Sequence, residues 1–332
     1  LSQVIDALKP VLEDPGVLKV GQNIKYDMGI LSRADIHLHP MDDTMLLSYV
    51  LAAGQRGHGL DELSKLYLGR QPIKFKDVVG TGKNQKTFDQ IHPEEAYEYA
   101  AEDADFTLRL YHHLLPELIS ERLSTVYQVI ERPLVPIISE MEQNGIRVDP
   151  QILHGLSREF ATQIDAMAQK IYKTAGHEFN IGSPQQLSTV LFDEMGLEGG
   201  KKTKTGAYQT GSEVLENLAA QGHEIAEHVL EWRQSSKLKS TYSDALANQI
   251  NPETGRVHTS FSLATTSTGR LSSSDPNLQN IPIRTEAGRQ IRNAFIAAKG
   301  CKLISVDYSQ IELRLIAELA NVSNATVSRF VR

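Results

Sequence analysis

Between residues 122 and 250, apolar side chains recur at helical spacing in one segment after another. These segments end at glycines, which readily close helices: Gly145, Gly176 and Gly196. Ser183 followed by Pro184 is typical of a helix start, because serine caps the first turn and proline fits its first position. Two more helices are expected through Leu238. The middle of the chain is therefore expected to be helical, either as a clamp of long antiparallel helices or as a plain bundle.

Strand signals flank this helical stretch. In VLKVGQNIKYDMGIL a short apolar run ends at Val20 and a helical pattern follows. Residues 1–120 continue in the same alternation, which predicts an α/β domain. From about residue 251 the segment GRVHTSFSLA alternates, and residues 302–306 of CKLISVD are typical of a buried strand. We expect three domains, over residues 1–120, 121–250 and 251–332.

Composition limits the surroundings of the chain. Its 332 residues contain no apolar run of about 18 residues, so no membrane span is expected. The single cysteine, Cys301, excludes an internal disulfide and suits a reducing compartment, so a cytoplasmic location is expected. The first residue is Leu1 in a helix-like segment, which suggests an internal fragment. A net charge of −7 argues against a surface uniformly suited to nucleic acid.

Two local patches are basic despite the negative net charge of the chain. KKTKTG contains Lys201, Lys202 and Lys204, and RQSSKLKS contains Arg233 and Lys237. Arg233 and Lys237 lie four residues apart, so a helix would present both on one face. Contact with DNA phosphates and an ordinary solvated surface are both open readings of these patches.

The segment SVDYSQIELRLIAELA places Asp307 directly after the expected strand. Ligands usually bind at the carboxyl ends of strands in α/β-type sheets, so Asp307 is a candidate site residue. A helix should follow, with one apolar face made by Ile311, Leu315, Ile316 and Leu319. The alternative is structural: Ser309 and Glu312 have the spacing of a capping box, and Asp307 then only orients the turn.

The segment TGRLSSSDPNLQNIP is rich in turn-forming residues and has few apolar anchors. Its long polar side chains can donate to purine N3 and pyrimidine O2 in the minor groove, whatever the base sequence: Arg270, Gln279 and Asn280. A solvated loop closed by its own Asn and Gln side chains is the alternative.

TGRLSSSDPNLQNIP and VDYSQIELR together resemble the family A DNA polymerases. The resemblance implies that Asp307 is one of two palm carboxylates that hold Mg²⁺ for nucleotidyl transfer. Glu312 would select deoxynucleotides, and Arg314 would support the site. The primer-terminal minor groove would be held by the side chains of the upstream loop, Arg270, Gln279 and Asn280.

The middle region is similar to the helical thumb of these polymerases, which follows the primer–template backbone. The similar segments are EFNIGSPQQLSTVLFDEMGL, KKTKTGAYQT and KLKSTY. The resemblance places Lys201, Lys202 and Lys204 at the thumb tip, with Arg233 and Lys237 along a helix. Trp232 is expected to belong to the core rather than to stack on bases.

The N-terminal region resembles the 3′–5′ exonuclease domain of the same family, which has a ribonuclease-H-like fold. VGQNIKYD contains Asn23 and Asp27, and YAAED contains Tyr99 and Asp103. The resemblance implies that Asp27 and Asp103 hold metal, that Tyr99 orients the attacking water, and that Asn23 contacts DNA. Without it, Tyr99 and Asp103 are merely helix neighbours and Asp27 an exposed helix residue.

The family's first exonuclease motif, its fingers helix and its second palm carboxylate motif are not found, and the tail after Ala320 departs from the family pattern. We expect the parent enzyme to be monomeric and to extend a DNA primer with deoxynucleoside triphosphates and Mg²⁺. This chain alone is expected to do so poorly, because one carboxylate does not make a metal site. The alternatives are a catalytically inactive duplex-binding module and a free-standing exonuclease.

Overall fold

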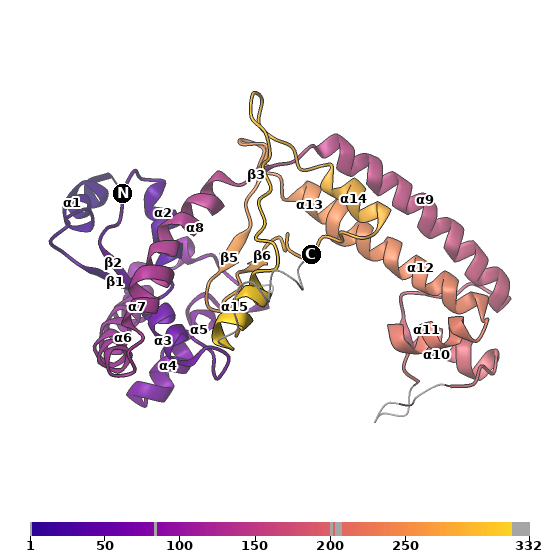
Figure 1. Cartoon of the computed structure of the whole chain (residues 1–332), viewed down its shortest axis with the longest axis horizontal. Coiled ribbons are helices and arrows are strands. Elements are labelled where there is room, and N and C mark those ends of the chain that lie inside the picture. Colours follow the sequence, from indigo (N-terminus) through magenta and orange to yellow (C-terminus); the bar gives the residue numbers. More distant parts are fainter. Residues whose placement is uncertain (1, 83–84, 200–201, 203–207, 321–332) are drawn as a thin grey trace. The chain divides into compact units, whose positions relative to one another are not determined.

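The computed structural model describes residues 2–82, 85–199, 202 and 208–320. The chain divides into two compact units, Leu1–Phe295 and Ile296–Arg332. Figure 1 shows that most of the first unit is helical, with a few short strands. Within the described ranges, no helix combines the length and apolar character needed to cross a bilayer.

The N-terminal strands form a small parallel pair. Strand β1 (Lys19–Gly21) pairs with β2 (Met41–Asp43), and helix α2 (Ile24–Ser32) connects them. Helix α3 (Thr44–Ala52) follows β2 directly, and the Asp43 side chain caps it by accepting from the Met45 amide. The α/β alternation expected for this region is confirmed, in a reduced form with two strands.

Helix α6 (Pro93–Ser120) is the longest element of this region. It begins with Pro93, because a first-turn proline loses no helical hydrogen bond. The other elements before it are short, apart from the N-terminal helix: α1 (Ser2–Leu12), α4 (Leu60–Leu63), the π-helical turn η1 (Ser64–Leu68), α5 (Phe75–Val79) and the 3₁₀ turn η3 (Phe88–Gln90).

One apolar core joins this region to later parts of the chain. Leu110, Leu114 and Leu118 form the buried stripe of α6, at the spacing of one helix face. They pack with residues of α3 and of α8 (Arg132–Asn144), and with Leu263 from beyond residue 250. Each fully buried leucine contributes roughly 2 kcal/mol of transfer free energy. The core therefore holds the segment around Leu263 against the N-terminal region.

The middle of the chain is helical, as its periodicity predicts. Gly145 and Gly176 end α8 and α9 (Pro150–Ala175), and the Ser183 side chain caps α10 (Pro184–Ser188). Helices α9 and α12 (Glu224–Leu238) pack along each other (Figure 1). The remaining helical elements are α7 (Ser124–Val126), η4 (Tyr127–Glu131), η5 (Thr189–Glu194), α11 (Ser212–Ala220), η6 (Lys239–Asp244) and α13 (Ala245–Asn248).

A separate apolar cluster holds the end of α9 and the helices from α10 to α12 together, and Trp232 packs against it. The expectation that Trp232 belongs to the core is confirmed. Two further clusters join the start of α9 to η6, α13 and α14 (Glu286–Arg292).

The segment after residue 250 adds two antiparallel strand pairs to the first unit. Strand β4 (Arg256–Val257) pairs with β3 (Ile146–Arg147), and β5 (Ser260–Ser262) pairs with β6 (Ser272–Ser274). The alternation in GRVHTSFSLA therefore marks real strands, interrupted between Val257 and Ser260.

Two expectations for the second unit are wrong. Residues 302–306 form no strand, and none of the strands in the described residues pairs with them. An extended segment becomes a strand only where a neighbouring strand supplies its hydrogen-bond partners. Helix α15 (Ile311–Leu319) lacks the expected capping box: Gln310 precedes it in a left-handed conformation with no side-chain cap. Its expected apolar face, Ile311, Leu315, Ile316 and Leu319, is exposed.

Candidate functional site

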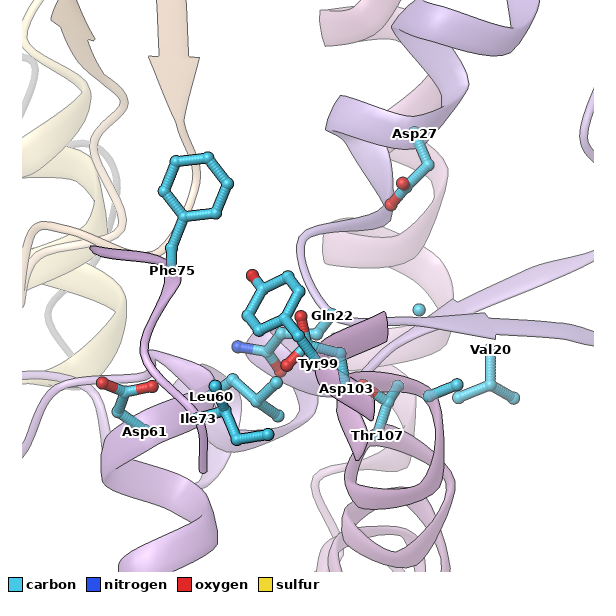
Figure 2. Close-up of a pocket in the computed structure, with 12 residues that line it drawn as sticks. Val20, Gln22, Asp27, Leu60, Asp61, Ile73, Phe75, Tyr99, Asp103 and Thr107 are labelled. Carbon is cyan, nitrogen blue, oxygen red and sulfur yellow. The ribbon is translucent and has the colours of Figure 1, made fainter. Parts of the chain in front are cut away.

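A pocket of about 550 Å³ opens in the N-terminal region of the first unit (Figure 2). Its walls come from three places in the sequence: the β1–α2 segment, the stretch between Leu60 and Phe75, and helix α6. The lining residues are Val20, Gly21, Gln22, Asp27, Leu60, Asp61, Ile73, Phe75, Tyr99, Asp103, Ala104 and Thr107. The fold therefore brings together Asp27, Tyr99 and Asp103, three of the residues that the two exonuclease-like motifs predict.

Tyr99 and Asp103 lie one turn apart on α6 and are hydrogen-bonded to each other. Burial raises the pKa of Tyr99 to about 12, helped by this hydrogen bond and by the negative charges of Asp103 and Asp61. Burial also raises the pKa of Asp103, against the effect of the Tyr99 hydrogen bond. The pair thus presents a protonated phenol beside a partly desolvated carboxyl group.

Asp27 reaches the pocket from α2 (Figure 2). Partial desolvation by the surrounding protein raises the pKa of its carboxyl group, although its side chain stays open to solvent. Helix α2 is held by the buried Asp43, which accepts from the amides of Asn23 at 3.1 Å and Ile24 at 3.0 Å. Asn23 itself adopts φ 56°, the left-handed conformation that asparagine tolerates better than most residues. It does not line the pocket.

Sequence reasoning missed several residues of this pocket. Asp61 lies in the first turn of α4, where an acidic residue only signals a helix start. Phe75 and Phe88 form an aromatic group with Tyr99, with ring centroids 5.9 to 6.1 Å apart. The amide of Ile73 donates to Glu102 of α6 at 2.6 Å, which fixes this wall. Two phenylalanines in a polar connection were the signal that could have found the group.

The segment from Thr268 to Pro282 is closed largely by its own polar groups. The Asn277 side chain accepts from the amides of Gln279 and Asn280, each at 3.1 Å, and Gln279 donates to the Leu271 carbonyl at 3.0 Å. Asn280 also accepts at its carbonyl from the Tyr242 hydroxyl. Arg270, Gln279 and Asn280 are nevertheless all exposed. The loop is self-closed, and it also offers these three side chains to solvent.

The basic residues of the helical region differ in their surroundings. Arg233 is half-buried and donates to the carbonyl and hydroxyl of Thr210, and burial lowers the pKa of its guanidinium group. Lys237, one turn later on α12, is exposed. The ammonium of Lys202 lies 4.7 Å from the centre of the Tyr208 ring. Lys201 and Lys204 lie outside the described residues.

The second unit carries Asp307, Glu312 and Arg314. Asp307 lies in an irregular segment, and Glu312 and Arg314 lie on α15. All three side chains are exposed.

The pocket carries two carboxyl groups that could act as ligands of a divalent cation. Asp27 and Asp103 both line it, and burial disfavours the charged form of each, so a nearby cation would offset that cost. Across the parts of the chain that the structure describes, no group of three or more His, Cys, Asp or Glu forms a closed metal site. Mg²⁺ needs only one or two carboxylates beside water and substrate phosphates.

Two protein families match this chain over separate ranges of residues. Residues 1–119 match the 3′–5′ exonuclease family, and residues 150–327 match DNA polymerase family A. The second match runs past Ala320, where the resemblance was expected to end. It covers more than half of the chain.

Two curated relatives illustrate the similarity. DNA polymerase I of Rhizobium leguminosarum is 55% identical over 98% of this chain and 32% of its own length. DNA polymerase I of Pseudomonas aeruginosa is 51% identical over 96% of this chain and 35% of its own length. The chain thus spans about a third of the length of these relatives.

A solved structure, the "POL domain of Pol1 from M. smegmatis complex with DNA primer-template and dNTP", is 37% identical. Its TM-score is 0.79, over 95% of this chain and 52% of that chain.

Proposed function

The chain belongs to DNA polymerase family A. We therefore propose that it functions within a DNA-directed DNA polymerase of the bacterial DNA polymerase I type, with an associated 3′–5′ exonuclease site. The roles would be DNA replication and repair synthesis, on a primer–template with deoxynucleoside triphosphates. The family match over residues 150–327 supports the polymerase part, and one observation carries the exonuclease part: the fold gathers Asp27, Tyr99 and Asp103 at one pocket.

In the proposed exonuclease site, Asp27 and Asp103 bind Mg²⁺, which would neutralise charge on the scissile phosphate. The Tyr99 phenol remains protonated at neutral pH and orients a water molecule by a hydrogen bond. Asn23 contacts the DNA strand. Positioning and charge neutralisation suffice for such a role, because phosphoryl transfer needs little covalent help from the protein.

In the proposed polymerase part, Arg270, Gln279 and Asn280 bind the primer-terminal minor groove through acceptors that all base pairs share. Asp307 binds Mg²⁺, Glu312 selects the deoxyribose, and Arg314 supports them. The exposure of all six side chains supports these roles, because each can reach a ligand without unfolding.

The proposed thumb spans residues 121–250, between an exonuclease-like domain of residues 1–120 and the start of a palm at residues 251–332. Four lysines contact the DNA phosphate backbone: Lys201, Lys202, Lys204 and Lys237. These contacts position the DNA without reading its sequence. Arg233 takes part through its remaining guanidinium donors, since two are engaged with Thr210. We further propose a monomeric, cytoplasmic enzyme.

A chimera tests this proposal. This chain would replace the corresponding third of the 55% identical relative, and primer extension and 3′–5′ digestion would be measured with Mg²⁺. We expect both activities, with extension lost in Asp307→Ala and digestion lost in Asp103→Ala. A folded but inert chimera, or one whose extension survives Asp307→Ala, would contradict the proposal. The chain by itself should extend a primer no faster than its own Asp307→Ala variant.

A non-catalytic duplex-binding module is the second candidate. The exposed side chains of Arg270, Gln279 and Asn280 favour it, because they can contact duplex DNA without any catalytic step. It predicts salt-sensitive, sequence-independent binding of duplex DNA with no turnover in the chimera.

A further inference from the structure

Tyr49 of α3 joins the N-terminal region to the loop that carries Arg270. Its hydroxyl donates to the Thr266 carbonyl at 2.9 Å and accepts from the Gly269 amide at 3.1 Å. Tyr49 is 4% exposed, and both hydrogen bonds are partly buried. The two partners lie 217 and 220 residues further along the chain.

We propose that Tyr49 is a positioning residue for DNA binding, which fixes the loop Thr266–Arg270 and thereby the direction in which Arg270 leaves the protein. The inference rests on the proposed function for the role of Arg270 itself. It adds a residue of the exonuclease-like region that acts on primer binding by the polymerase part.

The geometry of the loop explains how the two hydrogen bonds of Tyr49 can fix the position of Arg270. Gly269 has φ +75°, a conformation that a glycine adopts without strain, and its amide is one of the two groups that Tyr49 holds. The Thr266 hydroxyl donates to the Arg270 carbonyl at 2.7 Å, which closes the loop across its base. Tyr49 therefore holds the loop at its first residue and at the residue just before Arg270.

Packing around the loop also holds it close to α3. Leu263 belongs to the core that contains Leu46 and Leu47 of α3. On the other side, a Cβ added to Gly54 would lie only 2.5 Å from Cβ of Ser267, so the backbone after α3 approaches the loop closely. The segment from Leu263 to Ser267 thus lies against α3 and the residues just after it.

Tyr49 is itself held from the pocket side. Its ring meets His58 edge-on at a centroid distance of 5.6 Å, and the His58 ring is 2.9 Å from the Ser48 hydroxyl. Gln22, which lines the pocket, donates to the His58 carbonyl at 2.7 Å. A continuous series of contacts therefore runs from the pocket wall through His58 and Tyr49 to the loop.

Fixing the loop before DNA arrives reduces the conformational entropy that binding must remove. A loop that has lost its two bonds to Tyr49 would sample other conformations, and Arg270 would engage the groove in only some of them. The expected consequence of Tyr49→Phe is a drop in affinity for a recessed-end duplex of about three- to tenfold.

The test uses the full 332-residue chain with Tyr49→Phe, Arg270→Ala and the double variant. Tyr111→Phe is the matched control, because the Tyr111 hydroxyl, in the same region, donates to Asp42 at 2.9 Å rather than to the loop. Affinity for a fluorescent duplex with a recessed 3′ end is measured by anisotropy. Hydrogen–deuterium exchange of the peptide 262–271 reports the state of the loop.

We expect Tyr49→Phe to speed exchange in residues 262–271 and to weaken duplex binding, with neither effect in Tyr111→Phe. Because Tyr49 acts through Arg270, it should have no further effect on affinity in the Arg270→Ala background. Unchanged exchange in Tyr49→Phe, or effects on affinity that add in the double variant, would overturn the inference. Arg270→Ala with wild-type affinity would instead overturn the proposed role of Arg270, and exchange alone would then decide whether Tyr49 holds the loop.

Discussion

Lys25 and Glu142 form an ion pair with a distance of 2.6 Å between Nζ and Oε1, and their side chains are only 8% and 19% exposed. Lys25 lies on α2, two residues before Asp27, and Glu142 lies near the end of α8. The same Glu142 oxygen accepts from the Phe261 amide of β5. One carboxylate therefore ties the helix that carries Asp27 to a strand beyond residue 250.

Glu142→Ala should lower the free energy of unfolding by about 3 kcal/mol, because it leaves the Lys25 ammonium buried without its partner. Urea titration of the wild type and the variant measures this difference. The control is Asp105→Asn, which breaks the exposed pair between Asp105 and Arg109. That control should cost no more than about 0.5 kcal/mol, and equal losses in the two variants would contradict the buried pairing.

Because of Asp43, the free energy of unfolding should fall as the pH rises from about 4 to 6. Burial raises its pKa from 3.8 to about 6, so in this window the folded protein keeps a proton that the unfolded chain has lost. The pKa shift corresponds to a loss of about 3 kcal/mol in the free energy of unfolding once the carboxyl group is fully ionised.

The Asp43→Asn variant isolates this effect, because all other titrating groups cancel in the difference from the wild type. Urea titrations at pH 4 to 7 should show the wild type losing stability relative to the variant as the pH rises. A difference that is constant with pH, or one that grows in favour of the wild type, would show that Asp43 is not desolvated as described.

Gly54→Ala should displace the loop around Ser267. Position 54 has φ +72° and its added Cβ would lie 2.5 Å from the Ser267 Cβ, so backbone strain and a clash add together. Gly69→Ala is the matched control, because position 69 has φ +64° but nothing within 4 Å of the added Cβ. Because of the clash, Gly54→Ala should lower the free energy of unfolding by about 1–3 kcal/mol more than Gly69→Ala does, as measured by urea titration. Equal costs would mean that the loop does not lie against Gly54.

Asp103→Asn should weaken Mn²⁺ binding by about tenfold or more, because it removes one of the two proposed carboxylate ligands. Free Mn²⁺ can be followed by electron paramagnetic resonance during titration. Asp105→Asn serves as the control, since Asp105 lies on the same helix but does not line the pocket. Identical Mn²⁺ affinity in the wild type and Asp103→Asn would remove Asp103 from the proposed site.

Local pattern predicts the helices of this chain well. The stops at Gly145 and Gly176 and the cap at Ser183 depend on a few neighbouring residues, and all three are confirmed. The strand at 302–306 is wrong for the opposite reason: a strand depends on a partner elsewhere in the chain, which periodicity cannot supply.

The candidate pocket is only partly visible in the sequence. Asp27, Tyr99 and Asp103 belong to recognisable motifs, whereas Asp61 and Phe75 reach the pocket through tertiary packing alone. Arg233 illustrates the same limit, because spacing indicates an exposed phosphate contact while the fold turns it toward Thr210. The tether from Tyr49 to Gly269 crosses 220 residues, and no local signal predicts it.

We propose that this chain binds primer–template DNA through the DNA backbone and the minor groove, without reading the base sequence. The most direct measurement is the affinity of the wild-type chain for two recessed-end duplexes of unrelated sequence, by fluorescence anisotropy across a salt series. We predict equal affinities for the two duplexes and a linear fall of log K with log salt concentration. Absence of saturable binding at low salt, or a clear preference for one sequence, would contradict the claim.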